Sequence, residues 1–231
     1  MPLQSDSPTF AVRVRGPIAC FTRPEMKVER VSYEVITPSA ARGVLEAILW
    51  KPAIAWVVQR IHVLAPVRWI AFKRNEVTSK IATGTVRSAM RGGPLPALVV
   101  EDRRAQRNTL ALRDVDYVIE AGFRMVPDKV GPADTVVKFT EMFHRRLEKG
   151  QCFRTPYLGC REFVAQVEPA PEGWERLVRR GDTRELGWML HDIEFGAPAG
   201  NRPHFFLARM DGGVIEVPPF PPGSLEQGGA R

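Results

Sequence analysis

The sequence lacks the features that mark several common classes of protein. It contains no run of about 18 apolar residues, so no membrane-spanning helix is expected. Its first ten residues, MPLQSDSPTF, have neither the basic start nor the apolar stretch of a secretory signal. The three cysteines, Cys20, Cys152 and Cys160, are an odd set without CxxC spacing. This argues against a disulfide framework or a structural zinc site and favours a reducing cytoplasm.

Short catalytic signatures are also missing. The sequence has no P-loop, no GxGxxG at a strand–helix junction, no HExxH and no GxSxG. Its four histidines, His62, His144, His191 and His204, are scattered without ligand spacing, so we expect no metal site and no cofactor. No motif therefore indicates an enzyme that acts on a small molecule, although the fold class alone does not exclude such an enzyme.

Positive charge, in contrast, is plentiful and unevenly distributed. The net charge is +7, but residues 1–165 hold 26 Lys and Arg against 16 Asp and Glu, whereas residues 166–231 hold 7 against 10. Such asymmetry indicates a nucleic-acid surface on the first part of the chain. The alternative is an ordinary solvated surface that happens to be rich in arginine.

The opening block predicts a strand, a basic loop and a helix. Phe10, Val12 and Val14 alternate with Arg13 and Arg15, which is typical of a strand with one buried and one basic face. Gly16-Pro17 is expected to end this strand. After the loop, Thr37-Pro38 begins a helix as N-cap and first helical residue. Its apolar stripe is Ala41, Val44, Leu45 and Ile48, and Pro52 stops it.

Further alternating and amphipathic segments follow. Runs 56–64 and 67–72 predict strands, and 109–126 alternates well enough for a long amphipathic strand. The polar residues 75–108 predict a mobile hairpin or loop excursion rather than a packed element. A helix over 135–149 is expected, with Asp134 as N-cap and Gly150 as C-cap, before a returning strand over 161–167. The resulting order, β-α-β-excursion-β-α-β, is ferredoxin-like or RRM-like.

A second, smaller unit is predicted after a boundary at 169–173, PAPEG. Residues 1–168 form the RRM-like domain, with its inserted hairpin excursion. Residues 169–231 form a small antiparallel β-sheet domain with strands over 186–195, 204–210 and 214–217. Asp211-Gly212-Gly213 is a hairpin turn signal between the last two strands. The tail from residue 218, PPFPPGSLEQGGAR, predicts disorder. The fold class is therefore α+β.

Acid–base cleavage of RNA fits this composition without a metal. Such a reaction needs a base for the ribose 2′-hydroxyl, a cation for the phosphorane charge and an acid for the leaving 5′-oxygen. Candidates are Lys138 on the exposed side of the second helix, His144 beside two arginines, and Tyr33 in the basic loop. Each also has a purely structural interpretation: a solvated lysine, an ordinary histidine and a packed aromatic ring. Periodicity alone does not decide between them.

The candidate RNA-binding residues are cations in the first 150 residues. They come from the first strand, the basic loop, the first helix and its end, the patch at 73–75 and the second helix. Phosphate groups would be their targets, because neutralised phosphates release counterions. The set is Arg13, Arg15, Arg23, Lys27, Arg30, Arg42, Lys51, Arg74 and Arg145.

Three sequence blocks carry a resemblance to a known family. They are ACFTRPEMKVERVSYEVITPSAARGVLEAILWKPAI in the opening block, KRNEV at 73–77, and EKGQCFRTPYLGCREF at 148–163. Together they resemble the Cas-five subunit of type I-C (Dvulg) CRISPR systems, a member of the RAMP superfamily. The match covers most of residues 10–165, in order and at the family's spacing.

The resemblance implies a fold and a function. Such proteins have an RRM-like N-terminal domain and a small β-sheet C-terminal domain. They are metal-independent endoribonucleases that cut precursor CRISPR RNA in the repeat, at the base of its hairpin. They keep the 5′ handle as a subunit of the type I-C interference complex. The implied partners are repeat RNA and the other subunits of that complex, and double-stranded DNA binding is also associated with the family.

The family's catalytic set carries over only in part. Its positions fall on Leu49, Lys138 and Phe139, of which only Lys138 keeps the family's residue type. Leu and Phe replace residues that move protons. Two hypotheses are therefore open: a repeat-cutting endoribonuclease in which Tyr33 or His144 serves instead, and a non-catalytic subunit that holds the 5′ handle.

Overall fold

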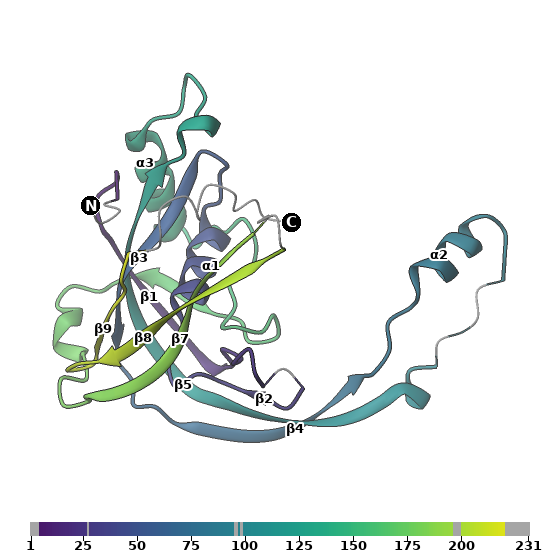
Figure 1. Cartoon of the computed structure of the whole chain (residues 1–231). Coiled ribbons are helices and arrows are strands. Elements are labelled where there is room, and N and C mark those ends of the chain that lie inside the picture. Colours follow the sequence, from purple (N-terminus) through teal and green to yellow (C-terminus); the bar gives the residue numbers. More distant parts are fainter. Residues whose placement is uncertain (1–4, 27, 95–96, 98, 196–199, 220–231) are drawn as a thin grey trace.

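The computed structural model describes residues 5–26, 28–94, 97, 99–195 and 200–219. Its fold is mixed α/β with antiparallel sheets (Figure 1). The central sheet has the strand order β6-β1-β5-β3-β9, with β2 and β4 also pairing with β5, and a separate ribbon is formed by β7 and β8. In the described part of the chain, no helix is long and apolar enough to cross a membrane.

Strand β1 (Phe10–Ala19) lies between β5 and β6, and it is longer than the sequence predicted. The expectation that Gly16-Pro17 ends it is wrong, because pairing with β5 resumes at Ile18. Strand β6 (Gln166–Pro169) pairs only with residues 12–15 of β1. Pro17 lies beyond the residues of β1 that pair with β6. Its missing N–H therefore costs no hydrogen bond to β6.

Helix α1 (Pro38–Ile48) confirms the predicted start and stripe. The Thr37 hydroxyl accepts a hydrogen bond from the Ala40 N–H at 3.3 Å, and Pro38 occupies the first turn. The apolar stripe is buried against the central sheet, where ring packing between Phe10, Trp56 and Phe143 fills the core. The start of α1 could be predicted from the sequence because its signals, Thr37 as N-cap and Pro38 in the first turn, are adjacent residues.

A hairpin of two long strands extends far beyond the body. β3 (Ile54–Val63) lies in the body, whereas β4 (Trp69–Val77) and β5 (Arg104–Met125) pair as far out as Val77 and Arg104. The short β2 (Arg30–Val31) runs parallel to β5, and a 3-10 turn, Glu101–Arg103, precedes β5. We call residues 77–107 the arm. Figure 1 shows it projecting from the molecule.

The arm decides between the two alternatives predicted for residues 75–108. The excursion is a hairpin, because its ends pair as ladder strands. Helix α2 (Thr83–Met90) lies at its tip and buries no residue. The polar, glycine-containing sequence concealed this helix because α2 has no core-facing stripe for periodicity to reveal.

Helix α3 (Val136–Glu148) has a different cap from the predicted one. Thr135 is the N-cap, since its hydroxyl accepts from the Lys138 N–H at 3.2 Å. The Asp134 carboxylate instead accepts from the Gly131 N–H at 3.0 Å, so its prediction as N-cap is wrong. Gly150 follows the helix with φ of 62°, the left-handed conformation that suits the position after a C-cap. A 3-10 turn, Pro127–Lys129, lies before α3.

The C-terminal strands pack on the same core as the helices. β7 (Arg184–Glu194) and β8 (Arg202–Met210) form the ribbon, after a 3-10 turn at Trp174–Leu177. The predicted turn at 211–213 is present, but β9 (Val214–Glu216) pairs with β3 in the central sheet. Met189 and Ala208 join the main buried cluster. The tail from residue 220 lies outside the described residues.

One buried ion pair fastens the ribbon to α1. The Arg42 guanidinium donates to both carboxylate oxygens of Asp192 in β7, at 2.6 and 2.8 Å, and it also contacts Glu46. The Asp192 side chain is only 6% exposed. Arg42 thus holds β7 on α1. It is one of the candidate RNA-binding residues predicted from the sequence, and the ion pair gives it a structural role instead.

Neutralising Asp192 tests this pairing. We expect Asp192→Asn to lower the free energy of unfolding by about 3 kcal/mol, because the Arg42 charge stays in a buried site without its main counterion. Urea denaturation measures the change. The control is Glu185→Gln, which removes an exposed pair with Arg209 and should cost no more than about 0.5 kcal/mol. Equal effects of the two substitutions would contradict the assignment.

Candidate functional site

Lys138 lies in the first turn of α3 with its ammonium exposed. Its Nζ donates to the Asp134 Oδ1 at 2.9 Å and to the Ala133 carbonyl at 3.3 Å. The hydrogen bond from Lys138, with a second from the Gly131 N–H, lowers the pKa of the Asp134 carboxyl. The ion pair restricts where the lysine side chain reaches and leaves the third ammonium hydrogen available to a ligand.

The C-terminal end of α1 lies beside α3 and is fixed by hydrogen bonds to its carbonyl oxygens. Arg146 of α3 donates to Ile48 O at 2.7 Å, and the Phe153 N–H donates to Ala47 O at 2.7 Å. The Trp56 indole donates to Leu49 O at 2.9 Å. These contacts satisfy carbonyls that a helix end otherwise leaves unpaired. They join α1, α3 and the segment after α3 into one rigid corner.

Cations gather at this corner. Lys51 follows α1 and lies close enough to Asp134 to influence its carboxyl electrostatically. Arg145 is seven residues after Lys138, on the same side of α3. Arg154 follows Phe153, whose ring lies 6.2 Å from that of Trp50. We call Lys51, Lys138, Arg145 and Arg154 the cationic patch. Sequence reasoning missed Arg154, because a loop residue held only by backbone hydrogen bonds leaves no periodic signal.

The two apolar residues that the sequence resemblance aligns with catalytic positions of the family are buried in the core. Leu49 is 0% exposed and Phe139 is 2% exposed. The Phe139 ring packs edge-on against Phe123, and the Lys138 ammonium lies 5.4 Å from its centroid. Phe139 therefore provides an apolar surface beside the Lys138 ammonium, and neither Leu49 nor Phe139 has a polar side-chain atom to offer a ligand.

Tyr33 lies in the core rather than at a reactive surface. Its side chain is 2% exposed, and the Arg23 guanidinium covers its ring at 4.5 Å from the centroid. Burial raises the pKa of its phenol, against the opposing effect of a hydrogen bond to the Leu190 backbone. A buried phenol that holds its proton more tightly is a poor general base. The packed-aromatic interpretation of Tyr33 fits this geometry.

His144 is exposed, but it faces away from Lys138. Its ring packs edge-on against Phe10, with centroids 5.1 Å apart. Six residues separate it from Lys138 along α3, which places the two side chains about 120° apart around the helix axis. The structure therefore does not bring Lys138, Tyr33 and His144 together into one cluster.

Most of the predicted RNA-binding arginines have acidic partners. Arg13 donates to both oxygens of Asp116 and contacts Glu168, which also pairs with Arg15 at 3.5 Å. Arg30 and Arg74 contact Glu76, and Arg74 also pairs with Glu162. Sequence counting could not anticipate these pairs, because their carboxylates come from distant strands and loops. Among the described residues Lys51 and Arg145 form no ion pair, whereas Lys27 lies outside them.

The arm supplies a second group of exposed cations. Residues 77–107 hold six Lys or Arg against two Asp or Glu. The members are Lys80, Arg87, Arg91, Arg103, Arg104 and Arg107. All of them are exposed except Arg107, which is half-buried, and the hairpin that carries them projects from the body (Figure 1).

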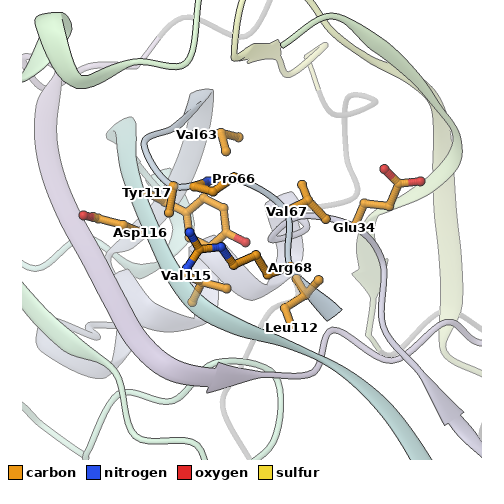
Figure 2. A pocket seen from close by; sticks show the side chains of 10 residues that line it. Glu34, Val63, Pro66, Val67, Arg68, Leu112, Val115, Asp116 and Tyr117 are labelled. Atoms are coloured by element: carbon orange, nitrogen blue, oxygen red, sulfur yellow. The ribbon is translucent and has the colours of Figure 1, made fainter. Parts of the chain in front are cut away.

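The pockets of the described residues are small. The one in Figure 2 occupies about 200 Å³ between Glu34, Pro66, Arg68 and the start of the body part of β5, with the Tyr117 ring inside it. A second, of about 300 Å³, lies beside the Arg42–Asp192 ion pair. Cavities that enclose small molecules typically span about 300 to 1,000 Å³, so both lie at or below the lower end of that range. Within the described ranges no group of three or more His, Cys, Asp or Glu side chains is placed to hold a metal ion. The open cationic surfaces are therefore the better candidates for a ligand site.

Solved structures with this architecture define the class of protein. A chain titled "Crystal Structure of CRISPR-associated Protein" matches with a TM-score of 0.65 and 25% sequence identity, covering 91% of each chain. A Streptococcus mutans protein, SMU1763c, described as functionally uncharacterized, matches with a TM-score of 0.62 and 22% identity over 92% of this chain and 93% of that one. The second likeness concerns the fold alone, whereas the first also indicates a CRISPR-associated protein.

Sequence comparisons narrow the class to one family. The family model described as CRISPR-associated protein (Cas_Cas5), of the Cas5d group, matches residues 9–218. Two curated relatives carry the name "CRISPR pre-crRNA endoribonuclease Cas5d". The one from Mannheimia succiniciproducens is 50% identical, covering 90% of this chain and 94% of the relative. The one from Thermus thermophilus is 43% identical, covering 90% of each. The chain belongs to the Cas5 family of type I-C, which confirms the resemblance seen in the sequence.

The cationic patch can be tested by the salt dependence of repeat-RNA binding. We expect Arg145→Gln to reduce the slope of log K against log[salt] by about 0.7 to 1, because one phosphate contact is lost. Fluorescence anisotropy at several salt concentrations measures it. The control Arg60→Gln removes an exposed arginine that Glu120 and Glu216 already engage, and its slope should stay at the parent value. The same slope for Arg145→Gln as for the parent would remove Arg145 from the interface.

Proposed function

We propose that this protein is an endoribonuclease that cuts precursor CRISPR RNA within its repeat and keeps the 5′ handle. The observation that carries this proposal is the pair of relatives, 50% and 43% identical over 90% of this chain, that are named pre-crRNA endoribonucleases. The positive charge of residues 1–165 supports an RNA substrate.

We infer that the N-terminal part has a ferredoxin-like framework. The support is topological: the strands that alternate with α1 and α3 lie in the order β6-β1-β5-β3, with every neighbouring pair antiparallel. That is the order expected when two β-α-β units are interleaved in one sheet. In this interpretation the arm is an insertion between the second and third framework strands, and residues 169–231 are the small β domain.

The cleavage chemistry that suits these residues needs no metal. The ribose 2′-hydroxyl attacks the adjacent phosphorus, negative charge develops on the phosphorane oxygens, and the 5′-oxygen leaves with a proton. Lys138 is the residue we assign to the phosphorane charge, since its ammonium is exposed and held by Asp134 at one corner of the cationic patch. We assign the proton transfer to neither Tyr33 nor His144, because Tyr33 is buried and His144 packs against Phe10 on another side of α3 from Lys138.

The proposal extends to partners and location. The protein that retains a 5′ handle would act as a subunit of the type I-C interference complex, beside the other subunits of that complex. Double-stranded DNA is a further ligand in this proposal, supported by the same excess of exposed cations. The expected location is the cytoplasm.

A second candidate function is a non-catalytic subunit that binds the handle of an RNA cut elsewhere. The observation that favours it is that Leu49 and Phe139 are buried and apolar, so neither can transfer a proton. Loss of a general base typically lowers a rate by about 10²- to 10⁴-fold. An enzyme that keeps its product turns over once, so a slow step would still serve it.

A cleavage assay in EDTA separates the two functions. Purified protein is incubated with labelled repeat RNA, and in parallel with the same RNA carrying one 2′-deoxynucleotide at the cleavage position. We expect the first RNA to be cut and the second to stay intact, because the nucleophile is the 2′-hydroxyl. If both RNAs stay intact while binding tightly, the protein is the non-catalytic subunit.

Lys138 has its own test. We expect Lys138→Ala to lower the single-turnover cleavage rate by at least about 10²-fold with less than a threefold loss in RNA affinity, since the charge acts in the transition state. The matched control is Lys149→Ala, which removes the same charge from the opposite end of α3. Equal rates for Lys138→Ala and the parent would exclude Lys138 from the mechanism.

A further inference from the structure

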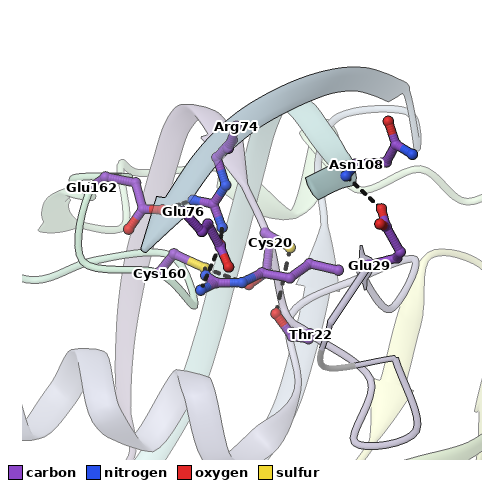
Figure 3. A network of polar contacts seen from close by, with 9 residues as sticks. Cys20, Thr22, Glu29, Arg74, Glu76, Asn108, Cys160 and Glu162 are labelled. Atoms are coloured by element: carbon purple, nitrogen blue, oxygen red, sulfur yellow. Dashed lines mark hydrogen bonds and ion pairs between the residues drawn. The ribbon is translucent and has the colours of Figure 1, made fainter. Parts of the chain in front are cut away.

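Two of the three cysteines lie in contact, although 139 residues separate them in the sequence. Cys20 directly follows β1, and its N–H donates to Leu158 O at 3.0 Å. Cys160, in the segment after α3, has its Sγ 3.7 Å from Cys20 O (Figure 3). Gly159 permits this approach: its φ is +83°, and a Cβ there would lie 2.0 Å from Cys20 O. This approach places the Cys160 side chain against the Cys20 backbone, and the two residues lie in one buried cluster with Ala111.

A guanidinium is aimed at one of the two sulfurs. Arg30 Nη1 lies 3.2 Å from Cys160 Sγ, and Arg30 Nη2 is held at 3.2 Å by Glu76 of β4. Cys20 Sγ lies 3.6 Å from the Thr22 hydroxyl on its other side. Arg30 thus places a fixed positive charge beside Cys160, the arrangement that favours a thiolate.

The two thiols are electrostatically unequal. A hydrogen bond from Cys20, supported by the Arg30 charge, lowers the pKa of Cys160 from its ordinary value, against the effect of burial. The pKa of Cys20 is raised, because its thiol proton is shared with Cys160 and because it is buried. The Arg30 guanidinium beside Cys160 makes this sulfur the one that reacts first, and Cys20 is the other thiol of the same buried cluster.

We propose that Cys20 and Cys160 form a redox site whose substrate is a hydroperoxide and whose product is an intramolecular disulfide. In the first step the Cys160 thiolate attacks one peroxide oxygen, which breaks the O–O bond, gives a sulfenic acid and releases water once the leaving hydroxide takes a proton. In the second step Cys20 sulfur attacks Cys160 sulfur and expels the sulfenic oxygen as water. Two thiols lose two electrons, and one hydrogen peroxide becomes two molecules of water.

The location of the site gives the disulfide a structural effect. Both cysteines pack with Ala111, Ile70, Phe72 and Phe163, where β4 and β5 leave the body toward the arm. A disulfide would covalently join the end of β1 to the segment after α3, beside the place where β4 and β5 leave the body. It would close a loop of about 140 residues, a length for which crosslinking is expected to restrict the unfolded chain strongly.

The test uses the full-length Cys152→Ser protein, so that only the two contacting thiols remain. The reduced protein is treated at pH 7 with one equivalent of hydrogen peroxide, and free thiols are then alkylated. We expect the intact mass to fall by about 2 Da, which is the loss of two hydrogens. Peptide mapping should show Cys20 linked to Cys160, and the Tm should rise by about 5 °C or more. Dithiothreitol should reverse all three changes.

Two further variants separate the site from incidental oxidation. Cys152→Ser/Arg30→Gln should form the disulfide about tenfold more slowly at pH 7. Cys152→Ser/Arg113→Gln, altered at an exposed arginine of β5 that pairs with Asp114, should react at the parent rate. The proposal is overturned if the peroxide-treated protein shows no Cys20–Cys160 link. It is also overturned if Cys160 proceeds to sulfinic acid while Cys20 remains a free thiol, or if Arg30→Gln and Arg113→Gln have the same effect.

Discussion

Burial of the Arg42 guanidinium between Asp192 and Glu46 holds helix α1 at the centre of the molecule. On one side α1 packs against the central sheet, and on the other the β7–β8 ribbon is fastened to it by this ion pair. The far end of the same helix is fixed by hydrogen bonds from α3 and the segment after it. The corner that carries Lys138 is therefore rigid because both ends of α1 are constrained, and a rigid scaffold is what electrostatic stabilisation of a transition state needs.

The apolar surface beside Lys138 shapes the chemistry available at this corner. Leu49 and Phe139 lie where a proton-transferring pair would be expected from the family, and both are fully within the core. Because both side chains are apolar, neither can accept or donate a proton. What remains is a positioned ammonium with neighbouring cations. Such a group contributes by charge, which is often the largest single term in a catalysed reaction.

Local signals in the sequence were sufficient for much of the fold. The hydroxyl and proline at 37–38, the alternation in β5 and the Asp-Gly-Gly turn each depend on residues close together in the chain, and each prediction is confirmed. Long-range pairing was not readable in the same way. β9 joins β3, most basic residues meet carboxylates from other elements, and Cys20 meets Cys160, because these contacts are decided only when the sheet closes. The domain boundary at 168/169 stays a prediction.

The long β4–β5 hairpin has a consequence for how stability is distributed. The described residues of the arm pair with one another and, at its base, with residues 74–76 of β4, and helix α2 buries no residue. Opening the arm therefore costs the molecule little of its buried area, whereas opening the body would expose the whole core. Amide protons at the outer end of the hairpin would exchange with solvent through local fraying, long before those of the paired strands beneath α1. The arm is thus free to change conformation around a ligand without lowering the global stability of the domain that carries it.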